Sequence, residues 1–161
     1  MPDFWMDADS LITPFRGPYR FEAVPQFWEF LKQQAQAGVI GSPELVLDKE
    51  LTSTGPPPDS LELWAKSLRG VLFLPPDAPT QLKYKDVAEH VQKNARYKQQ
   101  WIAPFLSGAD PWLVAYAAAQ GGRIVTFEKP EPLSSKPKIP DVAKQFGVSC
   151  WDALLELDFK V

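Results

Sequence analysis

Short apolar runs alternate along this chain with longer segments in which apolar side chains recur at helical spacing. The apolar runs predict five buried strands, at residues 3–8, 39–40, 71–74, 124–127 and 148–150. Amphipathic helices are expected between them, as after Pro25, where Phe27, Trp28 and Leu31 share one face. The alternation predicts an α/β fold in three α/β/α layers, with a short-stranded, mostly parallel sheet between helices.

Local signals place several element boundaries. Asp110 before Pro111, and Ser42 before Pro43, each pair a preferred N-cap with a preferred first helical residue. Two prolines and a glycine in residues 13–24 indicate an irregular loop, and a last helix is expected at residues 151–157. The 161 residues are 45% apolar, which predicts a single domain over residues 1–161 with a real core.

The composition limits the location of the protein and the kinds of catalytic site that it can form. The N-terminus does not resemble a signal peptide and no apolar run is long enough to cross a bilayer, so we expect a cytoplasmic protein without membrane contact. One cysteine and one histidine exclude a zinc site of the usual Cys/His type in a monomer and disfavour a Ser-His-Asp triad. Asp and Glu number 20 against 17 Lys and Arg, so oxygen ligands and a hard cation are the natural means of catalysis.

Acidic side chains follow the predicted strands. Asp7 and Glu128 come at the carboxyl ends of two strands, which share one edge in a parallel sheet. Asp110 reaches the same edge at a helix start, Asp9 lies in the loop after Asp7, and Glu50 lies near the apolar face of its helix. Converging carboxylates repel unless Mg²⁺ or Mn²⁺ neutralises them. The simpler alternative is that Asp7 is a turn or cap residue and Asp110 a cap.

Four motifs of the chain, taken in order, resemble those of a known family. The strand ending in Asp7, the Val46–Leu51 segment with Glu50, ADPWLVAYAAAQG with Asp110, and IVTFEKP are similar to the ordered motifs of PIN-domain (VapC-like) nucleases. The resemblance covers essentially the whole chain and is strongest with a small bacterial subfamily of undescribed function. It implies metal-ligand roles for Asp7, Glu50 and Asp110, while Glu128 stands where the family usually carries Asp.

The resemblance implies a Mg²⁺- or Mn²⁺-dependent endoribonuclease, with Glu128 or Asp9 completing the metal shell. Paired divalent ions hydrolyse phosphodiesters by activating water and by stabilising the leaving oxygen. RNA would be the substrate, held by the basic segments 83–98 and 129–138, and Tyr97 or Trp101 would stack a base. A toxin role with a cognate antitoxin, and a homodimer, stay open as partner hypotheses.

Two other functions remain open from the sequence. Asp7-Ala8-Asp9 after an apolar strand also fits a haloacid-dehalogenase-like phosphatase, although the downstream Asp pair of that family is not found. A non-catalytic PIN-like module that binds RNA or a protein is the alternative of a different class. The separation of the Asp7, Glu50 and Asp110 carboxylates would distinguish these hypotheses.

Overall fold

A five-stranded sheet forms the centre of the fold, and all of its strands are parallel. The computed structural model describes residues 2–52 and 58–152. The strands are β1 (Phe4–Met6), β2 (Ile40–Pro43), β3 (Phe73–Leu74), β4 (Arg123–Thr126) and β5 (Cys150–Asp152). Their order is β3-β2-β1-β4-β5, so the five predicted strands and the predicted α/β class are confirmed.

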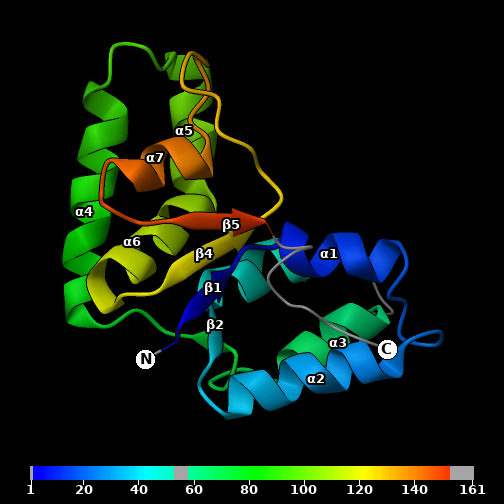
Figure 1. The fold of residues 1–161 in the computed structure, drawn as a ribbon. Helices are drawn as coiled ribbons and strands as arrows, with labels where there is room; N and C mark the ends of the chain where they lie inside the picture. The colour runs from blue at the N-terminus through cyan, green and yellow to red at the C-terminus, as the bar shows by residue number, and fades with distance from the viewer. Residues whose placement is uncertain (1, 53–57, 153–161) are drawn as a thin grey trace.

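Helices cover both faces of this sheet (Figure 1). One layer contains α1 (Asp9–Arg16), α2 (Pro25–Gln36), the π-helix η1 (Val46–Leu51) and α3 (Ser60–Ser67). The other layer contains α4 (Ala78–Lys93), α5 (Gln99–Ser107), α6 (Asp110–Gln120) and α7 (Ile139–Lys144). Each layer has its own apolar core against the sheet, as expected for a three-layer fold.

The central strand β1 is fixed from both sides, because successive side chains of a strand point to opposite faces. Met6 belongs to the core beneath α1 and α2, whereas Trp5 belongs to the core beneath α4 and α6. The Trp5 indole donates to the Gly121 carbonyl at 2.9 Å and meets the Tyr116 ring edge-on at 5.1 Å. Both side chains are fully buried, so the end of β1 has a defined position.

The sheet order has a direct consequence for ligand binding. Strand β1 lies between β2 and β4, and the chain connections run in opposite directions from this point. In open α/β sheets, ligands bind beyond the carboxyl ends of the strands at such a switch point. Met6 pairs in register with Val125, so the residues that follow β1 and β4 lie next to each other at that edge.

Three predicted boundaries were wrong. Residues 13–16 belong to α1 rather than to a loop, because Leu11 and Pro14 are buried in the core, and this burial outweighs the backbone hydrogen bond that Pro14 cannot donate. Ser42 is a buried residue of β2 rather than a cap, and its hydroxyl donates to the Met6 carbonyl at 2.7 Å. Residues 151 and 152 lie in β5, and 153–157 of the expected last helix lie outside the described residues.

No helix within residues 2–52 and 58–152 has the length and apolar character needed to cross a bilayer.

Candidate metal centre at the carboxyl edge of the sheet

Asp7 follows β1 directly and is 4% exposed. Its Oδ1 accepts hydrogen bonds from the Ser10 backbone N at 2.9 Å and from the Ser10 hydroxyl at 2.6 Å. Its Oδ2 accepts from the Thr126 hydroxyl at 2.6 Å. Burial raises the pKa of Asp7, and these three donors oppose the rise by stabilising the carboxylate. Asp7 precedes the N-cap residue Ala8 and accepts from a backbone N in the first turn of α1, while Oδ2 keeps a lone pair for a further partner.

Thr126 and Ser10 hold this carboxylate in place, and the sequence analysis did not identify either of them. The Thr126 hydroxyl donates to Asp7 and accepts from the Glu128 backbone N at 3.1 Å. The Ser10 hydroxyl lies 2.9 Å from the Val125 carbonyl oxygen as well as near Asp7. Both residues are buried, at 1% and 0% exposure, and buried polar side chains at a strand end are the signal that could have identified them.

Asp110 begins α6 as its first helical residue, and Ala109 rather than Asp110 occupies the N-cap position. The prediction of Asp110 as an N-cap was therefore wrong, and its carboxylate makes no capping hydrogen bond. The pKa of Asp110 rises from 3.8 to about 7. Burial is the main cause, followed by repulsion from four other acids, Glu128, Asp7, Glu50 and Asp9. These are the other four acids of the predicted site, so Asp110 lies within the electrostatic range of each of them.

Glu50 comes to this edge on the π-helix η1. Its side chain is exposed, so the prediction that it lies near the apolar face was wrong. Lys49 donates to the Ser107 carbonyl at 2.6 Å and thereby ties η1 to the end of α5. A Cβ on Gly108 would lie 3.7 Å from Glu50 Oε1, which places the carboxylate beside the chain that leads into Asp110. π-helical turns often mark functional sites, since the wider turn re-aims side chains.

Glu128 has a structural role as well as a charge. Its Oε2 accepts from the Ile139 backbone N at 2.9 Å, at the start of α7. Burial raises the pKa of Glu128, and the bond from Ile139 and the charge of Lys138 oppose that rise. The longer side chain of Glu thus reaches a helix start while its other oxygen stays available. Asp9 is exposed and is the first residue of α1 rather than a loop residue.

The donor set of this edge suits a hard divalent cation. Within the described residues, none of the five acids forms an ion pair with Lys or Arg at 4.0 Å or less. The side-chain positions in that part of the chain do not bring three acidic, cysteine or histidine groups around one point, so the separation of the Asp7, Glu50 and Asp110 carboxylates does not by itself favour the nuclease over the binding module. Mg²⁺ does not need such a set, because it keeps several waters and binds through one or two carboxylates. Asp7 and Asp110 are the two carboxylates that fit this coordination. Asp7 is buried and held by hydrogen bonds, and Asp110 is largely buried.

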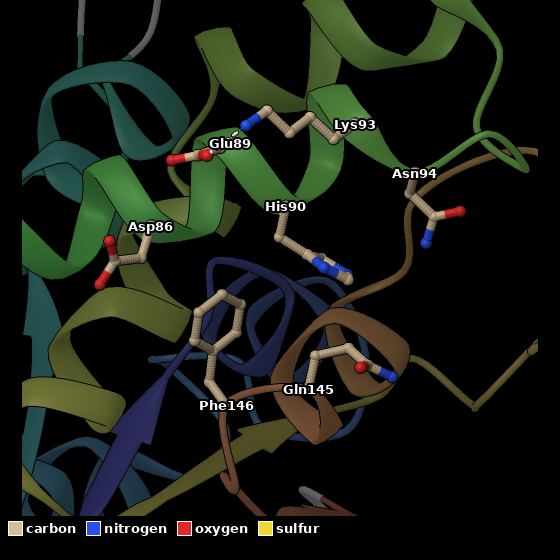
Figure 2. A pocket seen from close by; sticks show the side chains of 7 residues that line it. All are labelled: Asp86, Glu89, His90, Lys93, Asn94, Gln145 and Phe146. Atoms are coloured by element: carbon tan, nitrogen blue, oxygen red, sulfur yellow. Dashed lines mark hydrogen bonds and ion pairs between the residues drawn. The ribbon is translucent and has the colours of Figure 1, made fainter.

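The only cysteine and the only histidine of the sequence are not candidate ligands or nucleophiles at this edge. Burial raises the pKa of Cys150 to about 12, so its thiol stays protonated at neutral pH. His90 lines a separate hollow of about 500 Å³ between α4 and the end of α7, together with Asp86 and Phe146 (Figure 2). None of the five acids lines that hollow.

A smaller hollow of about 130 Å³ lies next to the acidic edge. Glu50 lines it together with Arg16 and Phe15 of α1. Arg16 therefore shares this hollow with Glu50.

No curated protein and no solved structure matches the chain. One family model does match it, over residues 4–158, which is nearly its whole length. That match includes all five acids of the carboxyl edge. The chain therefore belongs to the family described as a domain of unknown function, DUF4411.

Proposed function

We propose that this protein is a divalent-metal-dependent endoribonuclease that uses Mg²⁺ or Mn²⁺. The observation that carries the proposal is the placement of Asp7 and Glu128 after adjacent parallel strands, both bonded to Thr126 at the switch point of the sheet. The raised pKa of Asp110, about 7, agrees with a site that carries several negative charges. Strongly perturbed acids at such an edge are typical of functional sites. The acids cost folding free energy unless a cation neutralises them.

The roles follow from the surroundings of each residue. Asp7 and Asp110 would hold the cation, Glu50 would bind it directly or through water, and Glu128 or Asp9 would complete the shell. A bound divalent cation would supply activation of water and neutralisation of the charge on the leaving oxygen. The chain itself contributes orientation, because Ser10 and Thr126 fix the Asp7 carboxylate with three hydrogen bonds.

A phosphatase of the haloacid-dehalogenase type receives less support from this geometry. Such an enzyme attacks phosphorus with an Asp oxygen, which must be accessible to the substrate. Asp7 is 4% exposed, and both of its oxygens already accept hydrogen bonds. A non-catalytic module would keep the same buried network without turnover, so it is the alternative that the experiment has to separate from the nuclease.

The test is cleavage of a mixed RNA pool with Mg²⁺ or Mn²⁺, comparing wild type with Asp7→Asn and Asp110→Asn. We expect cleavage to be lost in both variants while circular dichroism stays unchanged. For Glu50→Gln we expect a partial loss, and Asp48→Asn is its matched control, since Asp48 lies on the same π-helix and instead pairs with Arg69 at 2.7 Å. Absence of cleavage by wild type, together with no change in melting temperature on adding either ion, would refute the proposal.

Biological partners belong to the same proposal. A ribonuclease of this kind would work on RNA in the cytoplasm, and a cognate antitoxin protein or a second copy of the chain would be its protein partner. Co-purification of the chain with a neighbouring gene product that blocks cleavage would support the toxin role. A cleavage rate unchanged by that product would argue against it.

A further inference from the structure

Two basic segments that are far apart in the sequence meet at the start of α5. The Lys98 backbone N donates to the Ser135 carbonyl at 3.0 Å. The Lys136 ammonium lies 5.2 Å from the centre of the Trp101 ring. Figure 1 shows the loop between β4 and α7 extending away from the sheet to reach this end of α5. The loop starts beside Glu128 and α5 ends beside Asp110, so both segments lead from this point back to the acidic edge.

The aromatic side chains here differ in access. Tyr97 is 6% exposed, so its buried ring is not available for stacking. The Lys136 ammonium lies over one face of the Trp101 ring, so a base would stack on the opposite face. Trp101 is 37% exposed. Of the two aromatic residues proposed from the sequence to stack a base, Trp101 is the one that the fold leaves accessible.

The lysines of the two basic segments differ in whether a carboxylate lies within ion-pair distance. Lys83 lies 3.7 Å from Asp86, Lys138 lies 3.8 Å from Glu131, and Lys93 pairs with Glu89. These pairs reduce the charge available to a phosphate. Lys98 and Lys136 have no carboxylate partner among residues 2–52 and 58–152. Lys136 therefore lies over the Trp101 ring, and Lys98 lies one helical turn before Trp101, its carbonyl accepting from the Trp101 backbone N at 2.9 Å.

The surface between Trp101 and the acidic edge contains no negative charge along α5. The exposed residues of this helix are Gln99, Gln100, Trp101, Ala103, Pro104 and Ser107. At its far end Lys49 donates to the Ser107 carbonyl at 2.6 Å, so a third cation lies beside the entrance to the acids. Nine residues of α-helix span about 13 Å, which is roughly four residues of a stacked strand at 3.4 Å each.

We propose that Trp101, Lys98 and Lys136 form a platform that binds single-stranded nucleic acid, with a base stacked on the indole and phosphates beside the two lysines. The strand then runs along α5 to Lys49 and the acidic edge. This inference rests on the proposed nuclease function for its direction toward Asp110, but binding at the platform needs no metal and no cleavage. Aromatic stacking suits single strands, because an unpaired base exposes its π-face.

The experiment measures binding in EDTA, where no cleavage occurs. The probe is a fluorescein-labelled single-stranded RNA of roughly twelve nucleotides, about three times the span of α5. Trp101→Ala should weaken its binding about 5- to 100-fold, the range expected for one lost base stack, and Trp101→Phe should restore most of it. Trp151→Ala is the matched control, since Trp151 is 36% exposed and carries Arg123 over its ring at 4.6 Å; we expect no change in affinity.

The lysines are tested through salt. Lys98→Gln and Lys136→Gln should each lower the slope of log affinity against log salt by about 0.7, the value for one phosphate contact on a single strand. Lys66→Gln should leave the slope unchanged, because Lys66 lies on α3 in the other layer, 3.9 Å from Glu62, and outside both basic segments. DNA of the same sequence separates recognition of the 2′-hydroxyl from recognition of base and phosphate alone, and equal binding of both fits the platform.

The platform and the nuclease can fail separately. Binding that depends on Trp101 without any cleavage would uphold the platform and refute the nuclease. Cleavage with equal affinity in wild type and Trp101→Ala would uphold the nuclease and refute the platform. Duplex RNA bound as tightly as single-stranded RNA would also refute the platform. So would a Trp101→Ala variant that binds RNA normally and differs from wild type only in association between protein chains.

Discussion

Asp110→Asn should stabilise the metal-free protein at neutral pH, although it should abolish the proposed activity. The Asp110 carboxylate is largely buried among four other acids, and its pKa rises from 3.8 to about 7. Below pH 3.8 the residue is protonated in the folded and unfolded states alike, so it has no effect there. Between pH 3.8 and 7 the folded state holds a proton that the unfolded state releases, so stability falls as pH rises.

The size of the effect follows from this pKa difference. At 1.36 kcal/mol for each pH unit, ionisation of Asp110 in the folded state costs about 4 kcal/mol above pH 7. The five acids share their repulsion, so we expect roughly 2 kcal/mol to be recovered when one of them becomes an amide. For a chain of 161 residues this corresponds to a rise of roughly 4–8 °C in melting temperature.

The assay is thermal unfolding in EDTA at several pH values between 4 and 8, for wild type, Asp110→Asn and Asp86→Asn. The difference between Asp110→Asn and wild type should be near zero at pH 4 and largest at pH 7 to 8. Asp86 is exposed and lies near Lys83, so its variant should change little at any pH. Mg²⁺ should then raise the melting temperature of wild type more than that of Asp110→Asn. A variant that is less stable than wild type at every pH would refute the reasoning, because it would mean that the carboxylate is already paired.

Further predictions concern stability, each measured by chemical denaturation. Thr126→Val should lower the free energy of unfolding by about 1.5–3 kcal/mol, because it removes the hydrogen bond to the Asp7 carboxylate at similar side-chain volume. A loss below about 0.5 kcal/mol would contradict this. Gly122→Ala should cost more than Gly121→Ala: both have positive φ, but a Cβ on Gly122 would lie 2.8 Å from a backbone oxygen, whereas Gly121 faces open space. Asp59→Ala should cost about 1 kcal/mol, since Asp59 caps α3 by accepting from a backbone N at 2.8 Å.

The layers of this protein and the sheet edge that carries Asp7 and Glu128 could be predicted from the sequence. Apolar runs define strands and helical spacing defines amphipathic helices, and both signals are local, so all five strands were predicted. Strand polarity then places Asp7 and Glu128 at carboxyl ends, whatever the order of the strands. The cap of α3 by Asp59 was also readable, because a capping box lies within one turn of chain.

The surroundings of these acids depend on contacts between residues that are far apart in the sequence. The order β3-β2-β1-β4-β5 makes β4 the neighbour of β1, and this contact brings Thr126 to Asp7 across 119 residues. Whether Asp110 caps its helix depends on where α6 begins, and the structure starts it one residue too early for Asp110 to act as the cap. Burial of Asp110 and repulsion from its neighbours require three dimensions, because pKa depends on charges that are close in space rather than in sequence.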